Sequence, residues 1–132
     1  MATVLLYNLS DRDKCMKIKL LLYRLGIAGR EVAPEEFGLP LGALLALPGF
    51  EAAEALPCEA FNGEMLVMHA LSQVQFSGLL DGLRREGLGV ALKAVVTETN
   101  AAWDSRRLHR ELSAEHAALS RARQSVHRKK KR

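Results

Sequence analysis

The fold is decided by residues 65–88, which read MLVMHALSQVQFSGLLDGLRREGL. The first part, Met65 to Leu71, is a mostly apolar run of the length expected for a buried β-strand. Ser72, with Gln75 three residues later, fits a capping box at the start of a helix. Apolar residues then repeat at the spacing of one helical face: Phe76, Leu79, Leu80 and Leu83. The stretch therefore predicts a strand followed by an amphipathic helix, which Gly87 ends.

A similar pattern occurs earlier in the chain, so the sequence contains two pseudo-repeats, residues 3–47 and 64–119. Residues 4–10, VLLYNLS, correspond to residues 66–72, LVMHALS. Three apolar positions of the first predicted helix have counterparts in the second: Cys15, Ile18 and Leu22 correspond to Phe76, Leu79 and Leu83. Each repeat is therefore predicted to start with a strand and an amphipathic helix.

Caps and shorter strand patterns complete the two predicted units. In the first, Ser10 is the expected N-cap of the helix, Gly26 ends it in a left-handed conformation, and Arg30 to Ala33 is a weak second strand. In the second, Val90 to Thr97 is the fourth predicted strand, and Asp104 is the expected N-cap of a last helix.

Two β-α-β units in series predict an α+β domain with a small ferredoxin-like sheet, both helices on one face of it, and a C-terminal helix. The alternative is an α/β doubly wound parallel sheet, because the proline-containing connector of residues 34–63 is long enough for a crossover. We expect a single domain over residues 1–120, followed by a basic, disordered tail over residues 121–132.

The basic character of the chain belongs to that tail. It holds seven basic side chains and no acidic one: Arg121, Arg123, Arg128, Lys129, Lys130, Lys131 and Arg132. Residues 1–120 hold twelve basic against fifteen acidic side chains, a net charge of about −3. This distribution argues against a basic-faced nucleic-acid-binding domain. The tail contains no aromatic residue, so it offers no base stacking. Two interpretations of it stay open: a solvated terminus that aids solubility, or non-specific contact with phosphates.

Composition narrows the class of protein. With 132 residues the chain has the size of one domain, and no apolar run approaches the length of a transmembrane helix. The N-terminal residues lack the pattern of an export signal, and two cysteines, Cys15 and Cys58, are too few for a disulfide scaffold. We therefore expect a cytoplasmic protein that makes no membrane contact.

Several segments together resemble a small bacterial family, domain-of-unknown-function family 3783. The specific part of the resemblance is residues 92–100, LKAVVTETN, followed by Trp103. Weaker matches extend it over most of residues 3–118: VLLYNL at 4–9, LGI at 25–27, PLGAL at 40–44 and MLVM at 65–68. Asp104 stands where we expect Thr or Ser as a cap, and Asp fulfils the same role. The resemblance implies no assigned activity, and it directs attention to Lys93 through Trp103.

That segment contains the candidate ligand-binding residues, Lys93, Thr97, Thr99, Asn100 and Trp103. They lie where the fourth strand ends and the last helix begins, a place where α/β proteins bind ligands and anions. The structural alternative is a loop in which Thr and Asn bond their own backbone and Trp103 packs over the start of the helix. We favour this structural interpretation, because no second cluster converges on the segment.

Other chemistry has little support in the sequence. The four histidines and two cysteines show no zinc-site spacing, so no metal is expected. The sequence also lacks a nucleophile elbow, a phosphate loop and a dinucleotide fingerprint, so it predicts no cofactor and no catalytic residue.

Three functions remain open. The first is a non-enzymatic binding or regulatory module that acts on protein partners, and this is the function we favour. The second is an accessory RNA-, DNA- or ribosome-associated protein that uses the basic tail. The third is an enzyme with a polar site at the turn of residues 93–103. A homodimer formed through an exposed strand edge is a further expectation.

Overall fold

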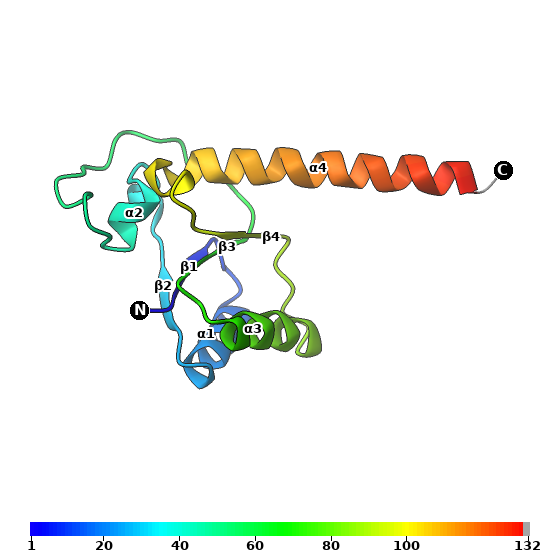
Figure 1. The fold of residues 1–132 in the computed structure, drawn as a ribbon, viewed down its shortest axis with the longest axis horizontal. Helices are drawn as coiled ribbons and strands as arrows, with labels where there is room; N and C mark the ends of the chain where they lie inside the picture. The colour runs from blue at the N-terminus through cyan, green and yellow to red at the C-terminus, as the bar shows by residue number, and fades with distance from the viewer. Residues whose placement is uncertain (131–132) are drawn as a thin grey trace.

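The computed structural model describes residues 1–130, and its first β-α-β unit lies at the N-terminus (Figure 1). Strand β1 (Thr3–Tyr7) leads into helix α1 (Arg12–Arg24), and strand β2 (Ala28–Glu31) follows. The N-cap of α1 is Asp11, whose side chain accepts a hydrogen bond from the backbone of Lys14. The prediction of Ser10 as the cap was wrong by one residue: Ser10 belongs to the turn that links β1 to α1, and its N–H bonds the carbonyl of Asn8.

The second unit has the same layout and confirms the predicted caps. It consists of β3 (Met65–His69), α3 (Gln73–Arg85) and β4 (Leu92–Val95). The side chain of Ser72 accepts from the backbone of Gln75, and the Gln75 side chain accepts from the backbone of Ser72, as a capping box requires. Gly26 after α1 and Gly87 after α3 both have positive φ, at +73° and +66°.

The remaining elements lie between and after the two units. The connector contains a 3₁₀ turn, η1 (Pro34–Glu36), and one helical turn, α2 (Leu41–Leu44). A second 3₁₀ turn, η2 (Asn100–Ala102), precedes the long helix α4 (Ser105–Lys130).

The four strands form one sheet in the order β2-β1-β3-β4. The outer pairs β1-β2 and β3-β4 are parallel, and the central pair β1-β3 is antiparallel, with Leu5 opposite Val67 at its middle. The predicted α+β class and C-terminal helix are confirmed. The strand order is not ferredoxin-like, because there the strands of the two units interleave, whereas here each unit keeps its own strands adjacent. The antiparallel centre also excludes the doubly wound parallel sheet.

This order relates the two units by an approximate twofold axis that passes between β1 and β3. Short links after α1 and α3 return the chain so that each second strand lies beside its own first strand. The apolar strands β1 and β3 are buried at the centre, whereas β2 is exposed along its whole length at one edge. The two strand edges expected to invite dimerisation are therefore β2 and β4.

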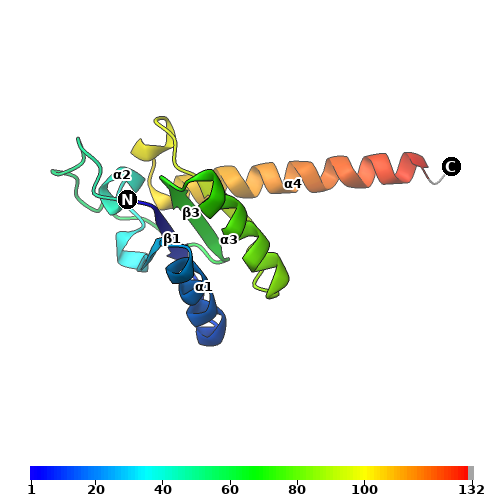
Figure 2. The ribbon, with the colours of Figure 1, turned by 60° about the horizontal axis from the view of Figure 1, so that its bottom comes forward.

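Each face of the sheet carries its own core. Figures 1 and 2 show the elements that cover the two faces. Helices α1 and α3 lie side by side on one face and pack there against Val4, Leu6 and Leu66. The other face is covered by the connector and the start of α4, which enclose Leu5 and Tyr7. The hydroxyl of buried Tyr7 lies 2.7 Å from that of Ser105, and burial raises the pKa of Tyr7 well above its ordinary value.

The two helices approach closely because α3 contains Gly78 and Gly82. A Cβ atom built on Gly82 would lie 2.7 Å from a methyl carbon of Leu21, and one on Gly78 would lie 2.8 Å from a methyl carbon of Leu25. A larger residue at either position would force the facing leucine side chain or its helix to shift.

Helix α4 extends far beyond the body of the protein (Figure 1). Its 26 residues span about 39 Å, and its first two turns contact the sheet layer through Leu108 and Leu112. The helix contains neither Gly nor Pro and is rich in Ala and Arg, which favour helix. It therefore takes in residues 121–130 of the segment that the sequence predicted to be a disordered tail. Lys131 and Arg132 lie outside the described residues.

Candidate functional site

The segment that the sequence singled out, Lys93 to Trp103, forms a compact turn. The Asn100 side chain accepts from the backbone of Thr97 at 2.7 Å, and the Thr97 hydroxyl accepts from the backbone of Asn100 at 3.1 Å. The Asn100 amide also donates to the carbonyl of Val95 at 3.1 Å. These bonds fix the turn between β4 and η2 and use both polar ends of the Asn100 side chain.

The five candidate ligand-binding residues do not meet in one place. Leu92 and Ala94 pack into the core beneath α4, so Lys93 between them points to the other face of the sheet, where its ammonium donates to the carbonyl of Val90. Trp103 packs on the α4 side instead, and Thr99 is exposed. Within the described part of the chain, this arrangement corresponds to the structural interpretation of the segment.

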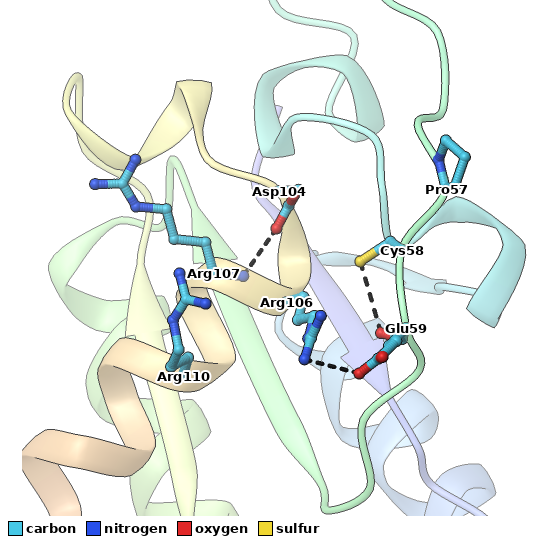
Figure 3. A pocket seen from close by; sticks show the side chains of 7 residues that line it. All are labelled: Pro57, Cys58, Glu59, Asp104, Arg106, Arg107 and Arg110. Atoms are coloured by element: carbon cyan, nitrogen blue, oxygen red, sulfur yellow. Dashed lines mark hydrogen bonds and ion pairs between the residues drawn. The ribbon is translucent and has the colours of Figure 1, made fainter.

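A cleft lies next to this turn, where the connector passes the first turns of α4 (Figure 3). Its volume is about 570 Å³. It is lined by Pro57, Cys58, Glu59, Asp104, Arg106, Arg107 and Arg110. Three of these seven side chains are arginines from α4, so the cleft is a candidate site for anionic groups.

The connector is held against α4 by a stack of aromatic rings. The ring of Phe61 lies between those of Phe37 and His109, at centroid distances of 4.5 and 4.1 Å. Burial lowers the pKa of His109, while a hydrogen bond with the backbone of Asn62 opposes that shift. The lowered pKa favours the neutral His109 ring. The ring stack holds the connector beside α4, where it forms one wall of the cleft.

The arginines of the cleft have different partners. Arg106 forms an ion pair with Glu59 at 2.9 Å, but the Glu59 side chain is 80% exposed, so water screens this pair strongly. The guanidinium of Arg107 lies 4.3 Å above the ring of Trp103. Among the side chains that the structure describes, Arg107 and Arg110 have no carboxylate partner within ion-pair distance. Two positive charges at the start of α4 are therefore available to a ligand.

The start of α4 is well defined because Asp104 caps it. The Asp104 carboxylate accepts a hydrogen bond from the backbone of Arg107 at 2.8 Å, as the sequence predicted. Leu108 is buried under the helix, and a residue two positions further on lies on the opposite side, which places Arg110 toward solvent.

The thiol in the cleft is not set up as a nucleophile. Burial raises the pKa of Cys58, and the nearby Asp104 carboxylate raises it further. A raised thiol pKa lowers the thiolate fraction at neutral pH, and the thiolate is the reactive form. The thiol therefore offers the cleft no activated nucleophile, and the arginines remain its candidate ligand-binding groups.

A second cleft of about 450 Å³ lies at the carboxyl ends of β1 and β2, beside the start of α1. Its carboxylate, Glu31, bonds Lys19 at 2.5 Å and Arg12 at 3.0 Å. These two partners lower the Glu31 pKa from 4.5 to about 2, so the carboxylate is charged and already paired. Because its carboxylate is already bonded by two cationic side chains, this cleft is a weaker candidate for a ligand.

Two further findings bear on the class of site. The described part of the chain contains no group of three or more His, Cys, Asp or Glu side chains arranged to hold a metal ion. Within residues 1–130, no helix combines the length and the apolar character needed to cross a bilayer.

The positive charge of the cleft continues along the helix. Residues 105–132 contain ten basic and two acidic side chains, whereas residues 1–104 contain nine basic and thirteen acidic ones. Arg121 is exposed on α4, and Arg123, Arg128, Lys129 and Lys130 lie further along the same helix. Sequence reasoning counted only the charges from Arg121 onward and missed the arginines at residues 106, 107 and 110. Their spacing around Leu108 was the signal that could have revealed them.

Comparison with known families gives one match, to the model of a domain of unknown function, DUF3783, over residues 64–119. These residues belong to the DUF3783 family. The DUF3783 segment includes β3, α3, β4 and the first half of α4, and therefore also the three arginines of the cleft. The first β-α-β unit and the last basic residues lie outside the match, which is shorter than the resemblance that the sequence predicted. No curated protein and no solved structure matches the chain.

Proposed function

We propose that this protein is a non-enzymatic binding protein that contacts the phosphate backbone of nucleic acid through α4. The observation that carries the proposal is the separation of charge between the body and this helix. Residues 1–104 have a net charge of −4, and residues 105–132 have a net charge of +8. An acidic body that carries a projecting basic helix presents one positively charged surface to a polyanion.

The arginines of α4 are spaced for contact along one side of the helix. Arg107 and Arg110 are three residues apart, and Arg121 follows Arg110 by eleven residues, which is close to three full turns. Leu108 and Leu112 hold the opposite side of the helix against the body. A polyanion can therefore approach α4 without displacing the core.

The binding we propose is non-specific with respect to sequence. Arginine forms paired hydrogen bonds to phosphate oxygens, which carry no base identity. The nearest aromatic side chain, Trp103, is already covered by the Arg107 guanidinium, and no aromatic residue follows it in the chain. Affinity from such contacts falls steeply with salt, because each neutralised phosphate releases its counterions.

The test is the salt dependence of binding to an RNA duplex of about 20 base pairs, long enough to run along α4. Affinity is measured by fluorescence anisotropy for the full chain, for a chain that ends at Ser120, and for Arg107→Ala/Arg110→Ala. We expect the slope of log affinity against log salt to decrease by about one unit for each lost phosphate contact, and the truncation to have the larger effect.

The matched control is Arg84→Ala/Arg85→Ala, which removes the same charge from the exposed end of α3. This variant should bind like the full chain, because its arginines lie on the other side of the sheet from α4. Equal loss of affinity in both double variants would show that only net charge matters, and salt-insensitive binding by all variants would rule out the proposal.

Contacts with protein partners, the function that the sequence favours, remain a prediction.

A further inference from the structure

Helix α1 is apolar on two opposite sides, and only one of them is covered. Its inner side, with Ile18 and Leu22 fully buried, packs against the sheet. On the outer side, Met16, Leu20 and Tyr23 follow one another at spacings of four and three residues, and they are 70%, 47% and 80% exposed. A surface helix ordinarily has one apolar stripe and a polar opposite side. The second stripe of α1 therefore indicates a contact surface.

We infer that the outer side of α1 is the interface of a twofold homodimer in which the α1 helices of two copies pack antiparallel. The charges at the two ends of the stripe indicate that its binding partner is a second copy of the chain. Asp13 lies one turn before Met16, and Arg24 directly follows Tyr23. Both side chains are exposed, and among the described residues neither has an ion-pair partner.

The antiparallel orientation makes this surface complementary to itself. In that orientation the start of one stripe faces the end of the other, so each Asp13 carboxylate lies opposite the Arg24 guanidinium of the second copy. A parallel pair would instead bring the two Asp13 side chains together and the two Arg24 side chains together, which is repulsive. A twofold axis perpendicular to α1 produces the antiparallel arrangement and closes the assembly at two copies.

Lys17 supports the same arrangement. It is exposed beside the stripe, and it too lacks an ion-pair partner among the described side chains. In the antiparallel pair it lies opposite Leu20 of the second copy, one turn from Tyr23, and an ammonium group near an aromatic ring is attractive. By contrast, Arg12 and Lys19 are occupied by Glu31, and Lys14 is occupied by Glu64.

The dimer leaves α4 accessible. Helices α1 and α4 lie on opposite sides of the sheet, as Figure 1 shows, so pairing through α1 does not cover the arginines of α4. The inference does not depend on nucleic-acid binding, and the two proposals fail in different measurements.

The test is sedimentation velocity of the full chain, without nucleic acid, over about a hundredfold range of protein concentration. We expect a monomer–dimer equilibrium that Leu20→Glu shifts fully to monomer, because it places a carboxylate at the centre of the apolar contact. The matched control is Leu119→Glu, since Leu119 is 58% exposed on α4. It should leave the equilibrium unchanged.

Charge reversal identifies the orientation. Asp13→Arg and Arg24→Asp should each weaken the dimer at least about tenfold, because each creates two like-charged pairs across the twofold axis. The double variant should restore the dimer, since the pairs are then reversed but opposite in sign. This restoration cannot arise from monomer stability, because both changes oppose the dipole of α1 and their effects on stability add. Glu98→Arg, an exposed reversal in the turn after β4, is the control for net charge.

Three results would overturn the inference. The first is a protein that stays monomeric at every concentration. This result would overturn the inference even if the monomer bound anionic vesicles through α1. The second is a dimer that Leu119→Glu disperses and Leu20→Glu does not. The third is a double charge reversal that is as weak as the two single ones combined. Circular dichroism of each variant confirms that the exposed substitutions leave the fold intact.

Discussion

The two β-α-β units share a layout, but their helices have different environments. Leu21 of α1 and Gly82 of α3 occupy matching positions, each ten residues after the N-cap, and they contact each other across the twofold axis. Two leucines would clash at this point, and two glycines would leave a gap. The pair of a large and a small residue lets the helices pack closely. The comparison shows that two units related by a twofold axis need different residues where their matching positions meet at that axis.

The outer sides of the helices differ as well. Helix α1 exposes the stripe of Met16, Leu20 and Tyr23, whereas Val74 is the one large apolar side chain that α3 exposes. The three arginines of the cleft, Arg106, Arg107 and Arg110, lie after the second unit, on α4. The proposed dimer surface therefore belongs to the first unit, and the proposed nucleic-acid surface belongs to the second. A dimer would present two α4 helices, so a long polyanion would bind more tightly than one helix allows.

The largest effect is expected from exchanging the residues at the axis. Gly82→Leu overpacks the contact and Leu21→Ala leaves a cavity, so each should lower the free energy of unfolding by about 2–3 kcal/mol. The double variant Leu21→Ala/Gly82→Leu should lose clearly less than the sum, because the large and the small residue have only exchanged sides. Urea denaturation measures all three variants, and strict additivity would contradict the proposed complementarity.

A smaller effect is expected at the matching last positions of β1 and β3, Tyr7 and His69. Tyr7→Phe leaves the fully buried Ser105 hydroxyl without its partner and should cost about 1–3 kcal/mol. Adding Ser105→Ala should recover part of that loss, since no unpaired polar group then remains. His69 is half-buried and has no such partner among the described residues, so His69→Phe should change thermal stability little. Similar losses at both positions would contradict this difference.

The helix caps provide the next comparison. Ser10 and Ser72 occupy matching places after their strands, yet only Ser72 caps a helix. Ser72→Ala and Asp11→Ala should each cost about 1 kcal/mol, and Ser10→Ala should cost almost nothing. Thermal denaturation of the three alanine variants is the measurement. A loss for Ser10→Ala equal to that for Ser72→Ala would contradict the cap assigned to Asp11.

The smallest effect concerns the two edge strands and depends on pH. Glu31 on β2 is paired, and its pKa is lowered to about 2, whereas the matching end of β4 carries Val95. A lowered carboxylate pKa stabilises the fold above its ordinary value of 4.5, and this contribution is lost as the pH falls toward 2. Because the side chain is 41% exposed, Glu31→Gln should cost no more than about 1 kcal/mol at neutral pH.

The check is the difference in unfolding free energy between the unmodified chain and the Glu31→Gln variant. It should be constant above pH 5 and should shrink as the pH falls through the interval from 4.5 to about 2. A difference that grew toward low pH would have the wrong sign for a lowered pKa.

Local features of the fold were predictable because neighbouring residues cause them. The capping box at Ser72, the left-handed glycines at the helix ends and the Asp104 cap depend on residues within a few positions of each other. The position of the first cap was missed because Ser10 and Asp11 are both good caps, and the turn geometry after β1 decides between them. The continuation of α4 was missed because its charge suggested disorder, although its residues favour helix.

The candidate site was less predictable, because distant parts of the chain form it. The turn of residues 93–103 has polar residues in sequence, but the Thr97 and Asn100 side chains bond each other. The arginine-lined cleft needs the connector beside α4, and the stack of Phe61 on His109 holds it there across 48 positions of sequence. Periodicity within one helix contains no information about such a contact.

The sequence by itself determined the two β-α-β units, the caps at Ser72 and Asp104, the α+β class and the unequal distribution of charge. These properties follow from short-range periodicity, from residue preferences and from simple counting. Only the tertiary structure decided the strand order, the contact of Leu21 with Gly82, the outer stripe of α1 and the place of the arginines beside the connector. These features depend on which surfaces meet in the folded chain, because the burial of a side chain is set by distant neighbours and not by its own segment. Helix α1 is the example: it has two apolar stripes, and only the packing decides that one is covered and the other exposed.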